Sequence, residues 1–228
     1  MNWHVITLFP EMFDSYMNES LMARAKEKKL MKVNFLNPRD FTKDKHRKVD
    51  DRPYGGGPGM VMYAEPILRA IDSIALKLKI KNEKLKIADK KTEKTKVVIL
   101  SPGGKMFTNK IAKDWAKKYS NIILISGRYE GIDARVKKIS KAEEISIGDY
   151  VLTGGELPAM VLIDSTMRQT SGFLGKVESI EENRNASHEV YTRPEILKYK
   201  EINHKVPKVL VSGHHANIEE WRKKRGNS

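Results

Sequence analysis

Apolar residues follow two patterns along this chain, short β-branched runs and longer stretches with helical spacing. The run at residues 121–126 (NIILIS) does not alternate with polar residues, which is typical of a parallel strand buried on both faces. Similar runs predict further strands at residues 3–9, 32–36 and 96–100. Helical spacing of apolar residues predicts helices at residues 12–30, 65–76, 107–119 and 216–224. The alternation of the two patterns predicts an α/β fold with a mostly parallel sheet.

Two glycine-rich turns, at residues 127–133 and within residues 144–160, each follow an apolar run. In an open α/β sheet, ligands bind outside the carboxyl ends of the strands, and glycines there let the backbone approach the ligand. Pro158 is suited to the first turn of a helix that follows the second turn. Ordinary structural β–α turns are the alternative interpretation. The turns also carry polar residues that we expect to be buried, namely Arg128, Glu130, Asp133 and Asp149, and this favours a ligand pocket.

A polar, unperiodic stretch covers residues 39–60, with a basic first half and a glycine-rich second half. So long a loop inside a compact domain is usually functional or disordered. It does not end in Gly-Lys-Ser/Thr, so it is not the phosphate-binding loop of nucleotide hydrolases.

Composition narrows the class of protein. The 228 residues carry a formal net charge of +14, which indicates an anionic partner such as a nucleic acid, the alternative being a general bias toward solubility. The absence of cysteine excludes disulfides, thiolate metal sites and cysteine nucleophiles. No apolar run is long enough for a membrane helix and no signal peptide is evident, so a cytoplasmic protein without membrane contact is expected.

Several long motifs carry a family resemblance. They are TLFPEMF (7–13), NPRDF through GGGPGM (37–60), LSPGGK (100–105), GRYEGID (127–133), SIGDYVLTGGELPAM (146–160), VYTRPE (190–195) and SGHHANIEEWR (212–222). Spread in order over nearly the whole chain, they resemble the TrmD family of bacterial tRNA (guanine-N(1)-)-methyltransferases, which belong to the SPOUT class.

The resemblance implies a fold and an assembly. It implies an α/β domain at residues 1–173 that binds S-adenosylmethionine and is threaded into a C-terminal trefoil knot, although simple connection rules argue against knots. A flexible linker at 174–187 and a small, mainly helical tRNA-binding domain at 188–228, truncated relative to the family, are expected to follow. The family works as a homodimer whose active sites draw on both chains, and it methylates N(1) of guanosine 37 in tRNA.

The family's methyl donor lies among the knot loops. By motif, the resemblance assigns donor contacts to Ser101, Pro102, Gly104, Gly127, Tyr129, Glu130, Gly131, Ile147, Gly148, Asp149, Tyr150, Val151, Leu152, Gly154, Gly155 and Pro158. Apolar and glycine-rich turns suit adenine, which needs a flat apolar slot edged by backbone polar groups. The Glu130 carboxylate could face the positive charges of the donor. The glycine fingerprint of Rossmann folds is absent, which disfavours nicotinamide cofactors and Rossmann-type methyltransferases.

Methylation of guanine N(1) requires a base that removes its proton and a group that stabilises charge on the neighbouring carbonyl oxygen. Arg168 matches the family's catalytic arginine, although an arginine that interacts with the helix dipole is the common alternative. Where the family has an aspartate base, this chain has Asn183, which cannot accept a proton. We hypothesise that Glu182 serves instead, with Glu181 as the other candidate and a solvated acidic patch as the alternative.

Further residues are assigned to the substrate or excluded as metal ligands. Asp50 and Gly59 match positions in the long loop from which the partner subunit is expected to contact donor or guanosine, and Asp133 is assigned to substrate binding. His214 and His215 lack ligand partners at suitable spacing, so no metal site is predicted. The resemblance leaves Mg²⁺ dependence open.

Two other functions remain as alternatives. One is an RNA-binding protein of the same fold with impaired catalysis, which Asn183 and the short C-terminal part favour. The other is a relative that methylates ribose or another base, which is the weaker alternative because the motif at residues 37–60 resembles this one family specifically.

Overall fold

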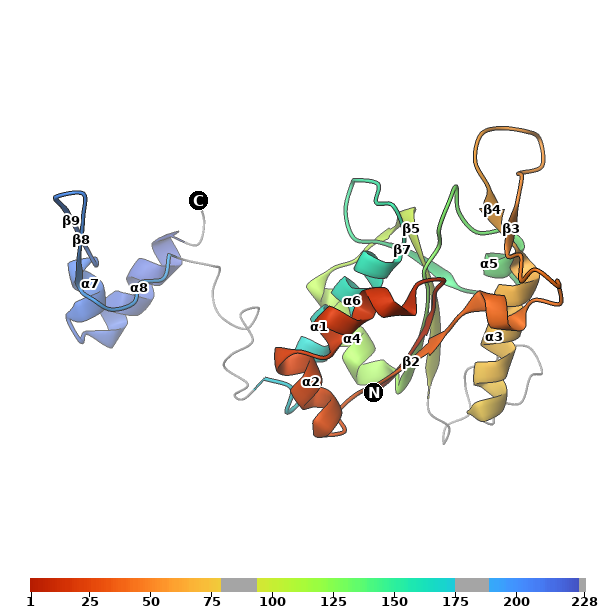
Figure 1. The fold of residues 1–228 in the computed structure, drawn as a ribbon. Helices are drawn as coiled ribbons and strands as arrows, with labels where there is room; N and C mark the ends of the chain where they lie inside the picture. Colours follow the sequence, from red (N-terminus) through yellow and green to blue (C-terminus); the bar gives the residue numbers. More distant parts are fainter. Residues whose placement is uncertain (79–93, 175–188, 226–228) are drawn as a thin grey trace. The chain divides into compact units, whose positions relative to one another are not determined.

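The computed structural model describes residues 1–78, 94–174 and 189–225, and the chain forms two compact units, 1–174 and 175–228 (Figure 1). None of the helices in the described parts of the chain has the length and apolarity needed to cross a membrane.

A five-stranded, all-parallel sheet forms the centre of the first unit, with strand order β2-β1-β6-β5-β7. The strands are β1 (Asn2–Ile6), β2 (Lys32–Leu36), β5 (Thr95–Met106), β6 (Asn121–Ile125) and β7 (Glu143–Ser146). The predicted parallel α/β sheet is therefore confirmed. β1 ends earlier than predicted, while β5 runs past residue 100, where the predicted strand ends.

Helices cover both faces of this sheet (Figure 1). In order they are η1 (Pro10–Phe13), α1 (Asp14–Met17), α2 (Ser20–Glu27), η2 (Pro38–Phe41), α3 (Ala64–Lys77), α4 (Asn109–Lys118), α5 (Arg135–Ser140) and α6 (Glu156–Arg168). Successive side chains of β6 point to opposite faces: Ile122 and Leu124 pack with α4 and α6, whereas Ile123 and Ile125 pack with α3 and α5. All residues of β6 are buried, which explains its unalternating sequence.

The single helix predicted at residues 12–30 is wrong. The segment contains η1, α1 and α2, and Ser20 has a φ of 51°, a left-handed conformation that a continuous α-helix cannot contain. Phe13, Met17, Met22 and Ala25 are nevertheless all buried in one core cluster. The apolar spacing therefore reported most of the buried side of the segment and missed the break, whereas Tyr16, which has the same spacing, is 44% exposed.

The long loop at residues 39–60 is tied to the first glycine-rich turn. It contains β3 (Asp50–Asp51), which pairs antiparallel with β4 (Val61–Met62). The Met62 amide donates a hydrogen bond to the Gly131 carbonyl at 2.9 Å, and the Asp133 amide donates to the Met62 carbonyl at 3.1 Å. These bonds hold the glycine-rich end of the loop beside residues 127–133.

The C-terminal unit contains an antiparallel hairpin of β8 (Ile196–Tyr199) and β9 (Ile202–Lys205), followed by α7 (Lys208–Val211) and α8 (His215–Arg225). The helix predicted at residues 216–224 is present. The hairpin was not predicted, so the description of this unit as mainly helical is incomplete. The proposed linker at 174–187 falls almost entirely outside the described residues.

Candidate active site

A cavity of about 380 Å³ opens at the carboxyl ends of β5, β6 and β7, a volume typical of small-ligand sites. Its wall is formed by residues 101–102 of β5 and by two loops, at residues 127–134 and 147–155. The predicted donor residues that line it are Ser101, Pro102, Gly127, Tyr129, Glu130, Gly131, Ile147, Gly148, Tyr150, Val151, Leu152, Gly154, Gly155 and Pro158. The three motifs, which are separate in the sequence, therefore converge on one space.

Two of the predicted donor residues do not line the cavity. Gly104 lies behind the wall, where a Cβ atom would be 2.5 Å from the Ile145 backbone nitrogen. Asp149 lies between two lining residues, and its side chain is exposed. The expected burial of polar residues is wrong for Asp149 and for Glu130, which is also exposed, because both lie on open loops rather than in the sheet.

The two glycine-rich turns meet backbone to backbone. The Gly155 amide donates a hydrogen bond to the Gly127 carbonyl at 2.9 Å. A Cβ atom at Gly155 would lie 2.6 Å from the Ser126 Cα atom, which leaves no room for any side chain. Glycine at this position is therefore a condition for closing the cavity wall.

Tyrosines shape the other parts of the wall. The Tyr150 ring lies over Gly148, where a Cβ atom would be 2.1 Å from the ring. Tyr129 has a φ of 59°, a left-handed conformation that is costly for a residue other than glycine. Such strain is concentrated at functional sites, and Tyr129 lines the cavity.

The charges around the cavity are mostly paired. Lys137 Nζ lies 2.6 Å from Glu144 Oε2, and the Arg135 guanidinium donates to the Asp133 carboxylate, which lowers the pKa of Asp133 below its ordinary value. Glu130 forms no ion pair with any described residue. Its carboxylate therefore supplies an uncompensated negative charge at a cavity whose wall also contains apolar residues such as Ile147 and Leu152.

The substrate residues predicted from the long loop are placed differently from one another. Gly59 lies against Glu130 of its own chain: a Cβ atom at Gly59 would be 2.4 Å from Glu130 Oε1, and the Glu130 amide donates to the Met60 carbonyl. Asp133 lines the cavity, whereas Asp50 belongs to β3 and does not. The predicted contacts of Asp50 and Gly59 with a partner subunit stay predictions.

Arg168 does not line the cavity of its own chain. It is the last residue of α6, which begins at the cavity with Glu156, and twelve residues of α-helix separate the two by about 18 Å. Near Arg168, Tyr16 donates a hydrogen bond to Asp164 at 2.8 Å, and burial together with this bond raises the pKa of Tyr16 to about 12. The structure does not describe the candidate bases Glu182 and Glu181, nor Asn183, which stands where the family has its aspartate.

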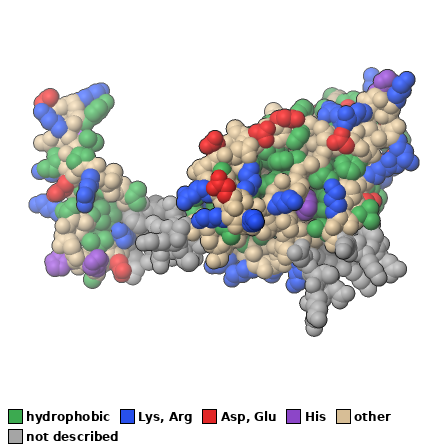
Figure 2. Space-filling model, turned by 60° about the horizontal axis from the view of Figure 1, so that its bottom comes forward, with side chains coloured by type: hydrophobic (Ala, Val, Ile, Leu, Met, Phe, Trp, Pro, Cys, Tyr) green, Lys and Arg blue, Asp and Glu red, His purple; other side chains and the backbone are tan. Residues whose placement is uncertain are grey.

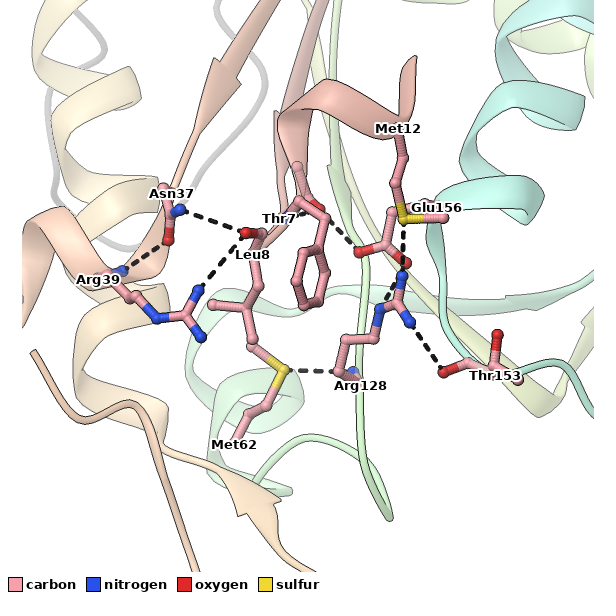
Figure 3. A network of polar contacts seen from close by, with 10 residues as sticks. Thr7, Leu8, Met12, Asn37, Arg39, Met62, Arg128, Thr153 and Glu156 are labelled. Carbon is pink, nitrogen blue, oxygen red and sulfur yellow. Dashed lines mark hydrogen bonds and ion pairs between the residues drawn. The ribbon is translucent and has the colours of Figure 1, made fainter. Parts of the chain in front are cut away.

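Sequence reasoning missed Glu156, which is 1% exposed at the start of α6. Its carboxylate accepts a hydrogen bond from Thr7 Oγ1 at 2.7 Å and forms an ion pair with Arg128 (Figure 3). The available signal was an acidic residue between two glycines and a proline at the start of a predicted helix. Its partners, however, are distant in the sequence.

No metal site is evident in the described part of the chain, where no group of three or more His, Cys, Asp or Glu side chains is placed to hold an ion. His214 and His215 are exposed near the start of α8.

Known proteins resemble this chain over nearly its whole length. A sequence profile described as "tRNA (Guanine-1)-methyltransferase TrmD" matches residues 1–228. A protein from Ruminiclostridium cellulolyticum is 46% identical over 97% of this chain and 89% of its own length. One from Clostridioides difficile is 45% identical over 98% and 91%, and one from Pseudoalteromonas atlantica is 46% identical over 96% and 78%. All three are named tRNA (guanine-N(1)-)-methyltransferase.

The adjacent glycines Gly103 and Gly104 allow a matched test of the close packing between β5 and β7 behind the cavity wall. A Cβ atom at Gly104 meets the backbone of β7, so Gly104→Ala is expected to lower the free energy of unfolding by about 1–3 kcal/mol. A Cβ atom at Gly103 meets nothing within 4 Å, so Gly103→Ala is the control. Urea unfolding followed by circular dichroism measures both, and equal stabilities for the two variants would contradict this packing.

Proposed function

Because the chain belongs to the tRNA (guanine-1)-methyltransferase TrmD family, we propose that it transfers a methyl group from S-adenosylmethionine to N(1) of guanosine 37 in tRNA. The observation that carries the proposal is the convergence of the three family motifs on one cavity at the carboxyl ends of adjacent parallel strands. We also propose that the protein acts in the cytoplasm, because tRNA is its proposed substrate.

The cavity has the properties that the methyl donor requires. S-adenosylmethionine supplies a methyl group made electrophilic by a positively charged sulfur. Ile147, Val151 and Leu152 offer apolar contacts for the adenine ring. Glu130 offers an unpaired negative charge, which would attract a cationic ligand.

The chemical step needs residues that this cavity does not contain. A base must take the N(1) proton, and we keep Glu182 as the hypothesis because Asn183 cannot accept a proton. A cation must stabilise the negative charge that develops on the guanine carbonyl oxygen, and Arg168 is the proposed group. No step is assigned to Mg²⁺.

The position of Arg168 supports an active site that two chains complete together. Its place about 18 Å along α6 from the cavity puts it beyond the reach of its own donor site. Large apolar side chains on η1, α1 and α6, and on the residue before η1, are exposed, namely Phe9, Met12, Tyr16, Leu157 and Val161. Exposed apolar residues gathered on neighbouring elements favour association, and we propose that a second copy of this chain covers them.

We also include the trefoil knot of the family in the proposal. The close backbone contact of the segment before α6 with the loop after β6 supports it, because such a contact brings the two crossing segments together.

The basic surface supports RNA as the substrate. Figure 2 shows lysine and arginine side chains spread over one face of each unit, in keeping with a net charge of +14 for the chain. We propose that the C-terminal unit contributes to tRNA binding. An RNA-binding protein with impaired catalysis is the second candidate, and Asn183 is the observation that favours it.

The activity is tested with two tRNA transcripts that differ only at position 37. Labelled S-adenosylmethionine is expected to transfer its methyl group to the transcript with guanosine there and not to the one with adenosine, because adenine carries an amino group in place of the carbonyl oxygen that Arg168 is proposed to stabilise. Methylation of neither transcript, with donor binding intact, would move the RNA-binding candidate ahead. Methylation of both would contradict the proposed base specificity.

The base is tested by removing the two candidate carboxylates separately. Glu182→Gln is expected to slow single-turnover methyl transfer by about 10²- to 10⁴-fold, because a positioned general base is lost. Glu181→Gln is the matched control and should change the rate by no more than about twofold. An unchanged rate in Glu182→Gln would exclude this residue, and a loss confined to Glu181→Gln would assign the role to its neighbour.

A further inference from the structure

The Arg128 side chain is engaged by separate segments of the chain through all of its nitrogens (Figure 3). Nη1 donates to the Thr153 carbonyl at 3.4 Å, and Nη2 donates to the Met12 sulfur at 2.9 Å. Nε lies 2.9 Å from Glu156 Oε2, an ion pair without hydrogen-bond alignment. The guanidinium also lies over the Phe9 ring, with its carbon 4.6 Å from the ring centroid.

The Glu156 carboxylate is buried, and each of its oxygens contacts one residue of the protein. Glu156 is 1% exposed, and its other oxygen accepts the hydrogen bond from Thr7. A buried carboxylate is costly unless it is paired. The only cation paired with it among the described residues is Arg128, whose side chain is 16% exposed.

The Arg128–Glu156 pair lies at the cavity wall. Arg128 itself lines the cavity, as do Thr153, Gly154 and Gly155, which precede Glu156. A Cβ atom at Gly154 would lie 2.4 Å from Arg128 Nε and 2.6 Å from Glu156 Oε2. The pair therefore occupies the volume that a side chain at residue 154 would fill, and the missing side chain lets the two loops close on each other.

We propose that Arg128 is a positioning residue for the methyl donor. Through Glu156 and Thr153 it holds the loop after β6 at a fixed separation from the start of α6, and through Phe9 and Met12 it anchors both to the N-terminal segment. The inference rests on the proposed function, since it names what sets the shape of that donor site. Arg128 acts through the loops and not on the donor itself, because its nitrogens are already engaged within the protein.

Lysine cannot replace this arginine. A guanidinium directs several N–H groups in a fixed plane, whereas an ammonium is a single point charge. Arg128→Lys keeps the positive charge that Glu156 requires, yet it cannot reach Thr153, Met12 and Glu156 together. The expected consequence is a folded protein with a loosened cavity wall.

The test compares charge-neutral and charge-preserving variants of the full chain. The double variant Arg128→Met, Glu156→Gln removes both charges and so leaves no buried charge unpaired, and Arg128→Lys preserves the charge. The matched control is Arg69→Met, Glu65→Gln, which removes a partly exposed ion pair on α3, away from the cavity. Calorimetry with S-adenosylhomocysteine gives the dissociation constant, steady-state kinetics give KM for donor and tRNA, and thermal unfolding reports folding.

The double variant and Arg128→Lys are expected to bind S-adenosylhomocysteine about 10- to 100-fold more weakly, as loosened positioning of a bound ligand predicts. KM for the donor should rise in parallel, while KM for tRNA changes by no more than about twofold, as in the control. If the role of Arg128 were purely structural, its variants would have lower thermal stability, and KM for the donor would not rise more than KM for tRNA.

Donor affinity equal to that of the wild type in Arg128→Lys would overturn the inference, as would an equal rise of both KM values. Wild-type protein that binds no S-adenosylhomocysteine would instead contradict the proposed function, and the inference with it. The two failures are thus distinguishable by the wild-type titration alone.

Discussion

The hydrogen bond from the Gly155 amide to the Gly127 carbonyl is the contact on which the cavity depends. It requires two backbones to meet without an intervening side chain, and only glycine permits that approach at residue 155. Once the two turns meet, the space beside Gly154 is filled by the Arg128–Glu156 pair, and the turns form a continuous wall. The parallel sheet supplies the scaffold, because it delivers the ends of β5, β6 and β7 to the same edge.

The sequence was a good guide where one local pattern has one physical cause. Burial on both faces produces an unalternating run, so residues 121–126 predicted β6 correctly. Helical spacing is less specific, since a broken segment can keep the same buried side, as Ser20 and its neighbours illustrate. The donor residues were predicted from family motifs, and most of them line one cavity. The Arg128–Glu156 pair could not be predicted, because no local pattern encodes a contact between a loop and a helix start that only the sheet brings together.

In the proposed function, the parts of the active site lie at two distant places in each chain. The cavity with Glu130 lies at the start of α6, and Arg168 lies at its other end. Because a rigid helix keeps its two ends apart, we propose that the arginine serves the donor site of another chain. An apolar surface that includes Leu157 and Val161 runs along the same helix, and this makes a second copy the natural source of the missing residue.

Methyl transfer by mixed dimers of two inactive variants tests most directly whether each active site combines parts of two chains. Arg168→Ala removes the proposed cation, and Leu152→Lys blocks the donor cavity at a lining residue that is 38% exposed and so tolerates substitution. If each site joins the cavity of one chain to the Arg168 of the other, every mixed dimer contains one complete site. Its second site has a blocked cavity and lacks Arg168. The account predicts that mixing restores about half of the wild-type activity per mixed dimer. Mixed dimers as inactive as their parents would contradict it and place the complete site within a single chain.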